Sequence, residues 1–448
     1  MFSRTTYKDT INLEVVVFMI IKNAKVLKGE VSIPGDKSIS HRAVMFGSIA
    51  KGTTEIKHFL QGADCLSTIH VFSQMGIEIT NKKESGIVTV KGKGLRGLEK
   101  PSSMLDVGNS GTTMRLISGI LSGQAFASSL TGDSSIVKRP MGRIITPLSL
   151  MGAKIKSIHD NGCAPLQIES NPKGLTGITY TLPVASAQIK SSVLLAGLYA
   201  NDETTVIEPS PSRNHTEIML RMLGSNIETQ MNRITVKPNP TLTGESIIVP
   251  GDISSAAYFI AAALIVPNSE VLIKNVGINP TRDGILRVFK NMGADITIQN
   301  IRNVDTEPVA DILVKHSNLV ATVIEGDLIP TLIDEIPIIA IVACYAKGET
   351  IIKDASELKV KESNRIDVMV NNLSKMGADI VATEDGMIIK GQCPLKGAAI
   401  DSKLDHRIAM SFAVAGLVSE GEVQIIGADC VTISYPNFYE DLESLSNK

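Results

Sequence analysis

Hydrophobic residues along the chain recur in two alternating kinds of predicted helix. In the first kind, an amphipathic segment with apolar residues at helical spacing runs into a glycine and then into a strand, as in "LRVFKNMGADI" and "MVNNLSKMGADI". The pattern returns at intervals of roughly 70 to 85 residues, long enough for a whole supersecondary unit. The glycines that end these segments are Gly76, Gly152, Gly224, Gly293 and Gly377.

The second kind of helix begins with polar or charged residues and continues as a nearly all-apolar, alanine-rich segment. Six such segments alternate with the first kind, among them "DISSAAYFIAAALIV" and "DHRIAMSFAVAGL". A helix that is apolar on all sides is buried. Intervening segments such as "GIVTVKG" and "GMIIKG" have the alternating, β-branched pattern of strands. The pattern therefore predicts an α/β fold whose repeats each contain a buried helix, a surface helix and strands.

The length of the chain favours two domains. A chain of 448 residues is too long for one ordinary core and suggests two domains of roughly 200 residues, hence three repeats in each. We expect the chain to cross between them near "SIPGD" and near "VPGD", with the polar ends of the buried helices meeting in a cleft between the domains. Domain one is then 1–35 plus 250–448, domain two is 36–249, and residues 1–18 are a possible N-terminal extension.

Composition and charge narrow the class of ligand. The formal charge of −2 gives no bulk attraction to nucleic acid or to an anionic membrane. The five cysteines are scattered, without a C-x-x-C pair, which argues against a disulfide framework or a structural zinc site and fits the cytoplasm. The longest apolar runs, of about 11 residues, are short for a bilayer span. We therefore expect a cytoplasmic protein that binds small molecules.

The stretch "PGDKSISHRA" predicts an anion site at the start of a buried helix. It is not a P-loop, because Asp36 separates Gly35 from Lys37. Ser38 is expected to cap the helix, whose amide end attracts an anion beside Lys37, with Arg42 one turn further on. The glycines of "KGKGLRG" have dinucleotide-loop spacing but run into "LEKPSS", which favours a turn at a strand end.

Four further motifs carry candidate chemistry with an alternative each. "GNSGTTMR" is either a tight helix start or a place where a ligand approaches backbone amides, and Arg139 before a proline is either surface charge or a fixed guanidinium. "VKESNR" sets Lys361 and Arg365 on one helical face, which also suits simple surface pairing. Arg407 enters an apolar helix, which is costly unless it meets an anion or an acid.

The pair Asp334 and Glu335 stands at the start of another buried helix, in "LIDEIP". Either carboxylate could act as a base or merely cap the helix. No metal-binding cluster, H-E-x-x-H or G-x-S-x-G motif is present in the sequence, so metal and hydrolytic chemistries lack support.

Taken in order, these motifs resemble the 5-enolpyruvylshikimate-3-phosphate synthase family across essentially the whole chain from about Met19. The markers are "PGDKSISHRA", "GNSGTTMR", "KRPMGR", "SAQIKSSVLLAG", "SRNHTE", "DEIP", "VKESNR" and "LDHRIAMSF". The resemblance implies the enolpyruvyl transferase fold, a two-domain inside-out α/β barrel with three βαβαββ repeats per domain, buried helices and outer sheets. It also implies a monomer that transfers the enolpyruvyl group of phosphoenolpyruvate to the 5-hydroxyl of shikimate 3-phosphate in aromatic amino acid biosynthesis, without a cofactor.

The resemblance also implies roles for individual residues. Shikimate 3-phosphate would be bound by Lys37, Ser38, Arg42, Ser186, Ala187, Gln188, Arg213, Asp334 and Lys361. Phosphoenolpyruvate would be bound by Lys37, Gly111, Arg139, Gln188, Arg365 and Arg407. The catalytic residues would be Asp334, Glu362 and Lys37, with Asp334 taking the hydroxyl proton and Glu362 delivering one to the methylene carbon.

The chain departs from one branch of the family at Ile433, where many members carry a lysine in a phosphate-release site; Ala187 and Arg213 fit the other branch. Gly111 stands where some members of that branch carry alanine and tolerate glyphosate, so we expect glyphosate sensitivity. Two alternatives stay open: the sister enolpyruvyl transferase that acts on UDP-N-acetylglucosamine with a loop cysteine, and a silent anion-binding module on the same scaffold.

Overall fold

The chain divides into two compact units. The computed structural model describes residues 2–8 and 15–446. Unit 1 comprises Met1–Pro34 and Pro250–Lys448, and unit 2 comprises Gly35–Val249. Within the described residues the strands form six four-stranded sheets, three in each unit. Every sheet has one parallel pair followed by two antiparallel pairs, so helices and strands are mixed as the sequence predicts, and the α/β class is confirmed.

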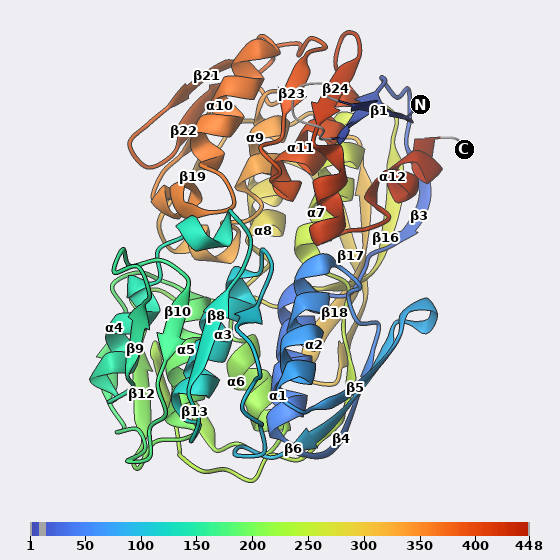
Figure 1. Ribbon diagram of the computed structural model, residues 1–448. Helices are drawn as coiled ribbons and strands as arrows, with labels where there is room; N and C mark the ends of the chain where they lie inside the picture. Colours follow the sequence, from blue (N-terminus) through green and yellow to red (C-terminus); the bar gives the residue numbers. More distant parts are fainter. Residues whose placement is uncertain (1, 9–14, 447–448) are drawn as a thin grey trace. The chain divides into compact units, whose positions relative to one another are not determined.

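Unit 2 is drawn in blue to yellow-green in Figure 1, and the blue strands that precede it in the chain belong to unit 1. Its sheets, in spatial order, are β15 (Ser246–Ile248), β4 (Lys51–Lys57), β6 (Ile87–Lys93) and β5 (Glu78–Lys82); β7 (Leu105–Asp106), β8 (Ser128–Thr131), β10 (Leu166–Ile168) and β9 (Ile155–Ser157); and β11 (Thr179–Thr181), β12 (Thr204–Ile207), β14 (Arg233–Val236) and β13 (Ile227–Gln230). Its helices are α1 (Lys37–Ile49), α2 (Ala63–Gln74), α3 (Gly111–Ser122), α4 (Gly142–Leu150), α5 (Ala187–Gly197) and α6 (His215–Met222), with 3-10 turns η1 (Lys83–Ser85) and η2 (Ile136–Lys138).

Unit 1 repeats this organisation. Its sheets, in spatial order, are β3 (Lys28–Ser32), β16 (Glu270–Gly277), β18 (Glu307–Lys315) and β17 (Asp295–Val304); β19 (Val323–Ile324), β20 (Glu349–Ile352), β22 (Met387–Lys390) and β21 (Asp379–Ala382); and β23 (Ala399–Asp401), β24 (Val423–Ile426), β2 (Val15–Ile21) and β1 (Phe2–Lys8). Its helices are α7 (Ile253–Ile265), α8 (Gly284–Asn291), α9 (Ile336–Ala343), α10 (Arg365–Lys375), α11 (His406–Gly416) and α12 (Phe438–Ser446), with 3-10 turns η3 (Gly326–Thr331), η4 (Ser356–Val360) and η5 (Ala428–Ile433).

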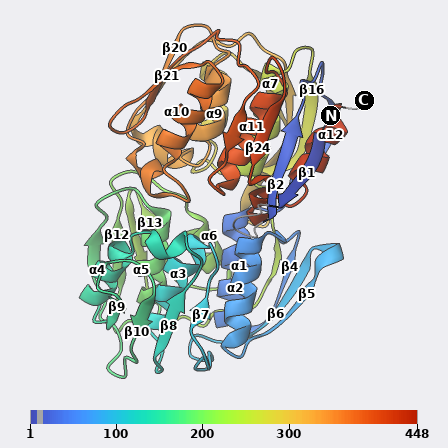
Figure 2. The ribbon, with the colours of Figure 1, turned by 45° about the horizontal axis from the view of Figure 1, so that its top comes forward.

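The apolar helices form the core of each unit. Every residue of α7, α9 and α11 is buried in unit 1, and α1, α3 and α5 are buried along most of their length in unit 2. In unit 2, α1 and α2 lie beside strands β4, β5 and β6 (Figure 2). A methyl group on Gly119 of α3 would come within 2.1 Å of the Ser192 carbonyl oxygen of α5, so this glycine allows two core helices to approach closely.

The glycines that follow the surface helices terminate them. Gly76 after α2 and Gly377 after α10 have φ angles of 81° and 89°, a left-handed conformation that glycine adopts without steric cost. Gly152, Gly224 and Gly293 follow α4, α6 and α8 in the same way. The predicted helix ends are therefore confirmed. The "KGKGLRG" stretch leaves β6 for a turn without opening a helix, which excludes a dinucleotide loop there.

Two local predictions are wrong. Lys361 and Arg365 do not share a helical face, because Lys361 follows the 3-10 turn η4 in an extended conformation and α10 begins only at Arg365. Asp36, rather than Ser38, is the N-cap of α1, because its Oδ1 accepts a hydrogen bond from the Ile39 backbone amide at 2.9 Å. The helix begins at Lys37, which places Ser38 inside the first turn.

The structure describes part of the possible N-terminal extension, residues 1–18. Phe2–Lys8 and Val15–Ile21 pair as antiparallel strands, and β2 joins β24 through residues 18–21. The rest of that segment, residues 1 and 9–14, lies outside the described residues.

Candidate functional site

In unit 2, the start of helix α1 carries three of the predicted binding residues. The Lys37 ammonium donates to Asp64 Oδ2 at 3.1 Å, and both side chains are largely buried. Arg213 donates from Nη1 to the Ser38 hydroxyl at 3.4 Å. Ser38 and Arg213 are 175 positions apart in the sequence, yet the hydroxyl and the guanidinium meet at the start of α1.

Arg42 is held from several sides inside unit 2. It is 2% exposed and donates to Thr216 Oγ1 at 2.7 Å, to Ser191 Oγ at 2.9 Å and to the Ser38 carbonyl at 3.0 Å. Because these partners come from three helices, the guanidinium keeps one orientation beneath the first turn of α1.

The start of α3 brings Gly111 next to two guanidinium groups. An added methyl group on Gly111 would lie 2.9 Å from Arg115 Nη1 and 3.2 Å from Arg139 Nη1. Arg139 itself donates to Asn109 Oδ1 at 2.8 Å and to Ser135 Oγ at 3.1 Å, so it is a fixed guanidinium rather than solvated surface charge.

The start of α5 is linked to this cluster. Ser186 is the N-cap of α5, its Oγ accepting from the Ile189 amide, and Ala187 is the first helical residue. Gln188 Oε1 accepts from Arg115 at 2.6 Å, and Gln188 Nε2 donates to Thr112 Oγ1 at 3.2 Å. Arg115 therefore joins the Gln188 side chain to the loop that contains Arg139.

In unit 1, Asp334 is the centre of a second cluster. Its Oδ1 accepts from Lys361 Nζ at 3.2 Å and from Arg365 Nη1 at 3.3 Å. Arg407 donates from Nη1 to the Asp334 carbonyl at 3.2 Å, and its Nη2 lies 3.9 Å from Asp334 Oδ2. Three cations predicted from two motifs therefore surround one predicted carboxylate.

Arg365 is the most enclosed of these cations, at 1% exposure. It donates to Glu362 Oε2 at 2.6 Å and from Nε to Asp405 Oδ2 at 2.9 Å. Burial opposes its charge, but Asp405, Glu362 and Asp334 outweigh that effect and raise the pKa of the Arg365 guanidinium. Arg365 therefore stays charged and holds the two predicted acid/base carboxylates on either side of itself.

Three residues of these clusters were not predicted as site residues. Asp64 pairs with Lys37, Arg115 bonds Gln188, and the fully buried Asp405 both pairs with Arg365 and caps α11. Each contact joins residues 27 or more positions apart, which a local motif does not reveal. Ile433, where the chain departs from one branch of the family that the motifs resemble, packs against the hydrophobic core of unit 1.

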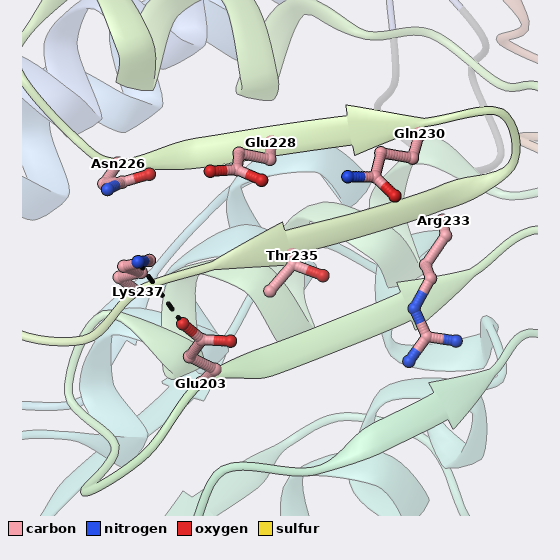
Figure 3. A pocket seen from close by; sticks show the side chains of 7 residues that line it. All are labelled: Glu203, Asn226, Glu228, Gln230, Arg233, Thr235 and Lys237. Atoms are coloured by element: carbon pink, nitrogen blue, oxygen red, sulfur yellow. Dashed lines mark ion pairs between the residues drawn. The ribbon is translucent and has the colours of Figure 1, made fainter.

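Two surface hollows lie apart from these residues. One, of about 180 Å³, opens on the strands β12, β13 and β14 of unit 2, and Figure 3 shows polar and charged side chains around it, with Lys237 paired to Glu203 at 3.6 Å. The other, of about 700 Å³, lies in unit 1 beside β3, β16 and β18. Neither hollow is lined by a residue that the sequence selects for binding or catalysis.

Fixed cations beside paired carboxylates are typical of enzymes that act on phosphate and carboxylate substrates. Across residues 2–8 and 15–446 no group of three or more His, Cys, Asp or Glu side chains could hold a metal ion. No helix in the described part of the chain is long and apolar enough to cross a membrane.

The comparisons with known proteins identify the family. The family model described as EPSP synthase (3-phosphoshikimate 1-carboxyvinyltransferase) matches residues 21–442, and the chain belongs to this family. Relatives named 3-phosphoshikimate 1-carboxyvinyltransferase from Thermoanaerobacter sp. (strain X514) and Geobacillus kaustophilus (strain HTA426) are 58% and 54% identical over 425 residues. These alignments cover 95% and 94% of this chain and 99% of each relative.

A solved structure has the same fold. An EPSP synthase structure from Acinetobacter baumannii matches with a TM-score of 0.84 and 47% identity, over 96% of this chain and 98% of that chain. The resemblance inferred from the ordered motifs is thereby confirmed.

Proposed function

We propose that this chain is a 3-phosphoshikimate 1-carboxyvinyltransferase: it transfers the enolpyruvyl group of phosphoenolpyruvate to the 5-hydroxyl of shikimate 3-phosphate and releases phosphate. Family membership over residues 21–442 supports the activity. The observation that carries the proposal is the unit 1 cluster, where Lys361, Arg365 and Arg407 lie within 4 Å of Asp334 oxygens. Anion-binding groups and an acid/base carboxylate therefore occupy one place.

The substrates explain why so many cations are needed. Phosphoenolpyruvate and shikimate 3-phosphate each carry a phosphate and a carboxylate, and each anionic group needs a fixed cation or backbone amide. We assign shikimate 3-phosphate to Lys37, Ser38, Arg42, Ser186, Ala187, Gln188, Arg213, Asp334 and Lys361. We assign phosphoenolpyruvate to Lys37, Gly111, Arg139, Gln188, Arg365 and Arg407.

The reaction is an addition followed by an elimination. Asp334 takes the proton of the 5-hydroxyl while the hydroxyl oxygen bonds to C2 of phosphoenolpyruvate. Protonated Glu362 gives its proton to C3, which becomes a methyl group. In the second step the bond from C2 to the phosphate oxygen breaks, the Glu362 carboxylate takes a proton back from the methyl group, and Asp334 gives its proton to the leaving phosphate. The enol ether and phosphate are the products, and both carboxyl groups regain their starting forms. Arg365 bonds Glu362 and Asp334 at 2.6 and 3.3 Å and so keeps both carboxyl groups oriented for these transfers.

The finer description of the fold belongs to the same proposal. Each unit is an inside-out α/β barrel of three βαβαββ repeats, which the shared pairing pattern of the sheets and the buried helices support. The five cysteines form no disulfide, which fits a cytoplasmic enzyme, and we propose a monomer that needs no cofactor.

Asp334→Asn and Glu362→Gln test the acid/base roles. Both changes keep the side-chain volume, so each variant is expected to stay folded and to lose activity by about a hundredfold or more. Phosphate release with both substrates measures kcat, and unchanged circular dichroism serves as the folding control. A variant that keeps the wild-type kcat contradicts the role proposed for that carboxylate.

A further inference from the structure

The Glu335 side chain points away from the helix that it begins. Glu335 is the N-cap residue of α9, yet its side chain makes no capping hydrogen bond, although the sequence allowed that use. It is 1% exposed. A carboxylate buried to this degree is costly unless it is paired and hydrogen-bonded, so its contacts indicate its use.

Those contacts lead to a substrate-binding arginine. Glu335 Oε1 lies 3.5 Å from Arg407 Nη1 and accepts a hydrogen bond from the Ser254 hydroxyl. Arg282 Nη2 donates to the same Ser254 oxygen at 2.5 Å. Because a guanidinium can only donate, the single hydroxyl proton of Ser254 is directed at Glu335.

The chain of contacts ends on a rigid element. Arg282 also donates to Asp252 Oδ1 at 3.1 Å, and Asp252 caps helix α7 through the Ser254 amide at 2.9 Å. Asp252, Ser254 and Arg282 are all at most 4% exposed. Glu335 is therefore tied to the start of a core helix on one side and to the Arg407 guanidinium on the other.

We propose that Glu335 is a positioning residue for phosphoenolpyruvate: it holds Arg407 in the orientation that binds this substrate, and Ser254 and Arg282 hold Glu335. This inference rests on the proposed function and adds a residue to it. Glu335 does not touch the reacting atoms; it acts through Arg407. Asp334 contacts the same guanidinium, at Nη1 through its carbonyl and at Nη2 through Oδ2, and Glu335 adds a buried carboxylate oxygen at Nη1.

The test separates positioning from folding by a graded set of variants. Glu335→Ala removes the contact to Arg407, Glu335→Gln keeps an oxygen that can accept from Ser254 and Arg407, and Ser254→Ala removes only the hydrogen bond behind the carboxylate. Asp311→Ala is the matched control, since Asp311 is a buried carboxylate of unit 1 that bonds the Asn275 amide and Asn300 instead.

Steady-state kinetics are measured with each substrate varied in turn. Glu335→Ala is expected to raise KM for phosphoenolpyruvate about 10-fold to 100-fold, with KM for shikimate 3-phosphate and kcat changed by less than about threefold. Glu335→Gln and Ser254→Ala are expected to show smaller rises of the same KM. Asp311→Ala lowers stability and leaves both KM values unchanged.

Thermal stabilisation by phosphoenolpyruvate in the presence of shikimate 3-phosphate gives a second readout that needs no turnover. Wild-type activity together with an unchanged KM for phosphoenolpyruvate in Glu335→Ala overturns the inference alone. Equal losses for both substrates also overturn it, because they indicate general damage. A wild-type protein that neither turns over nor is stabilised by the substrates overturns the proposed function and the inference with it. If Glu335→Ala does not fold, the Glu335→Gln and Ser254→Ala pair decides by the same criteria.

Discussion

Lys190 of helix α5 is a buried cation whose removal has a calculable effect. Its ammonium lies 2.9 Å from Glu208 Oε2 and 2.7 Å from Glu217 Oε1, and it donates to the Ser212 carbonyl at 3.3 Å. All three ionic side chains are at most 4% exposed. Glu208 also accepts from the Ser212 amide, so the group fixes the loop that leads to Arg213.

Lys190→Met leaves two carboxylates in the interior without their cation. Breaking a buried ion pair by removing one partner costs about 3–5 kcal/mol. In a unit of this size, each kcal/mol of lost stability lowers Tm by roughly 2–4 °C. Tm is therefore expected to fall by about 6–20 °C at neutral pH. The chain has no tryptophan, so urea and thermal unfolding are followed by circular dichroism at the helix band.

The pH dependence distinguishes charge from packing. Burial raises the pKa of Glu208, an effect that Lys190 opposes, so loss of Lys190 raises this pKa further. A carboxyl with a raised pKa in the folded state contributes stability at low pH that is lost as the pH rises through that value. The deficit of Lys190→Met should therefore be smaller at pH ~5 than at pH ~8.

A triple variant gives the control. Lys190→Met combined with Glu208→Gln and Glu217→Gln removes all three charges and should recover most of the lost stability. The reasoning is refuted if Lys190→Met costs less than about 1 kcal/mol, or if its deficit is the same at both pH values.

Three other predictions concern unit 2. Burial, then Lys37 and Arg42, lower the pKa of His41 well below its ordinary 6.5, so its contribution to stability is present above pH 6.5 and lost as the pH falls below it. We expect His41→Gln to reduce the loss of unfolding free energy below pH 6.5 by up to ~1.4 kcal/mol per pH unit, as measured by urea unfolding at several pH values. An unchanged dependence of this free energy on pH would count against the role of His41. Gly111→Ala should keep the fold but displace Arg115 and Arg139, raising KM for phosphoenolpyruvate ~10-fold; an unchanged KM would show that the guanidinium groups relax freely. Wild-type protein should be inhibited by glyphosate in competition with phosphoenolpyruvate, and Gly111→Ala less so, whereas indifference of the wild type at millimolar glyphosate would contradict the expectation.

Local sequence patterns predict much of the fold because they report local physics. Glycine at positive φ terminates surface helices, as at Gly377, and uninterrupted apolar character marks a buried helix such as α7. The capping error at α1 has an equally local cause. Asp36 and Ser38 are both good caps two positions apart, so residue type does not decide between them.

Local sequence patterns do not predict the contacts within the site. Arg115 with Gln188 and Asp64 with Lys37 join residues 73 and 27 positions apart, and no spacing rule relates them. For Glu335 the sequence allowed a base or a cap. The structure pairs it with Ser254 and Arg407, residues whose proximity depends on how three core helices pack.

The most direct test of the central proposal is phosphate release by the purified wild-type chain given phosphoenolpyruvate and shikimate 3-phosphate. Each substrate is omitted in turn, and UDP-N-acetylglucosamine replaces the acceptor in a parallel reaction. We predict release only with both shikimate-pathway substrates, together with a product whose mass equals shikimate 3-phosphate plus the enolpyruvyl group. Release with UDP-N-acetylglucosamine instead, or no release with either acceptor from folded protein, would contradict it.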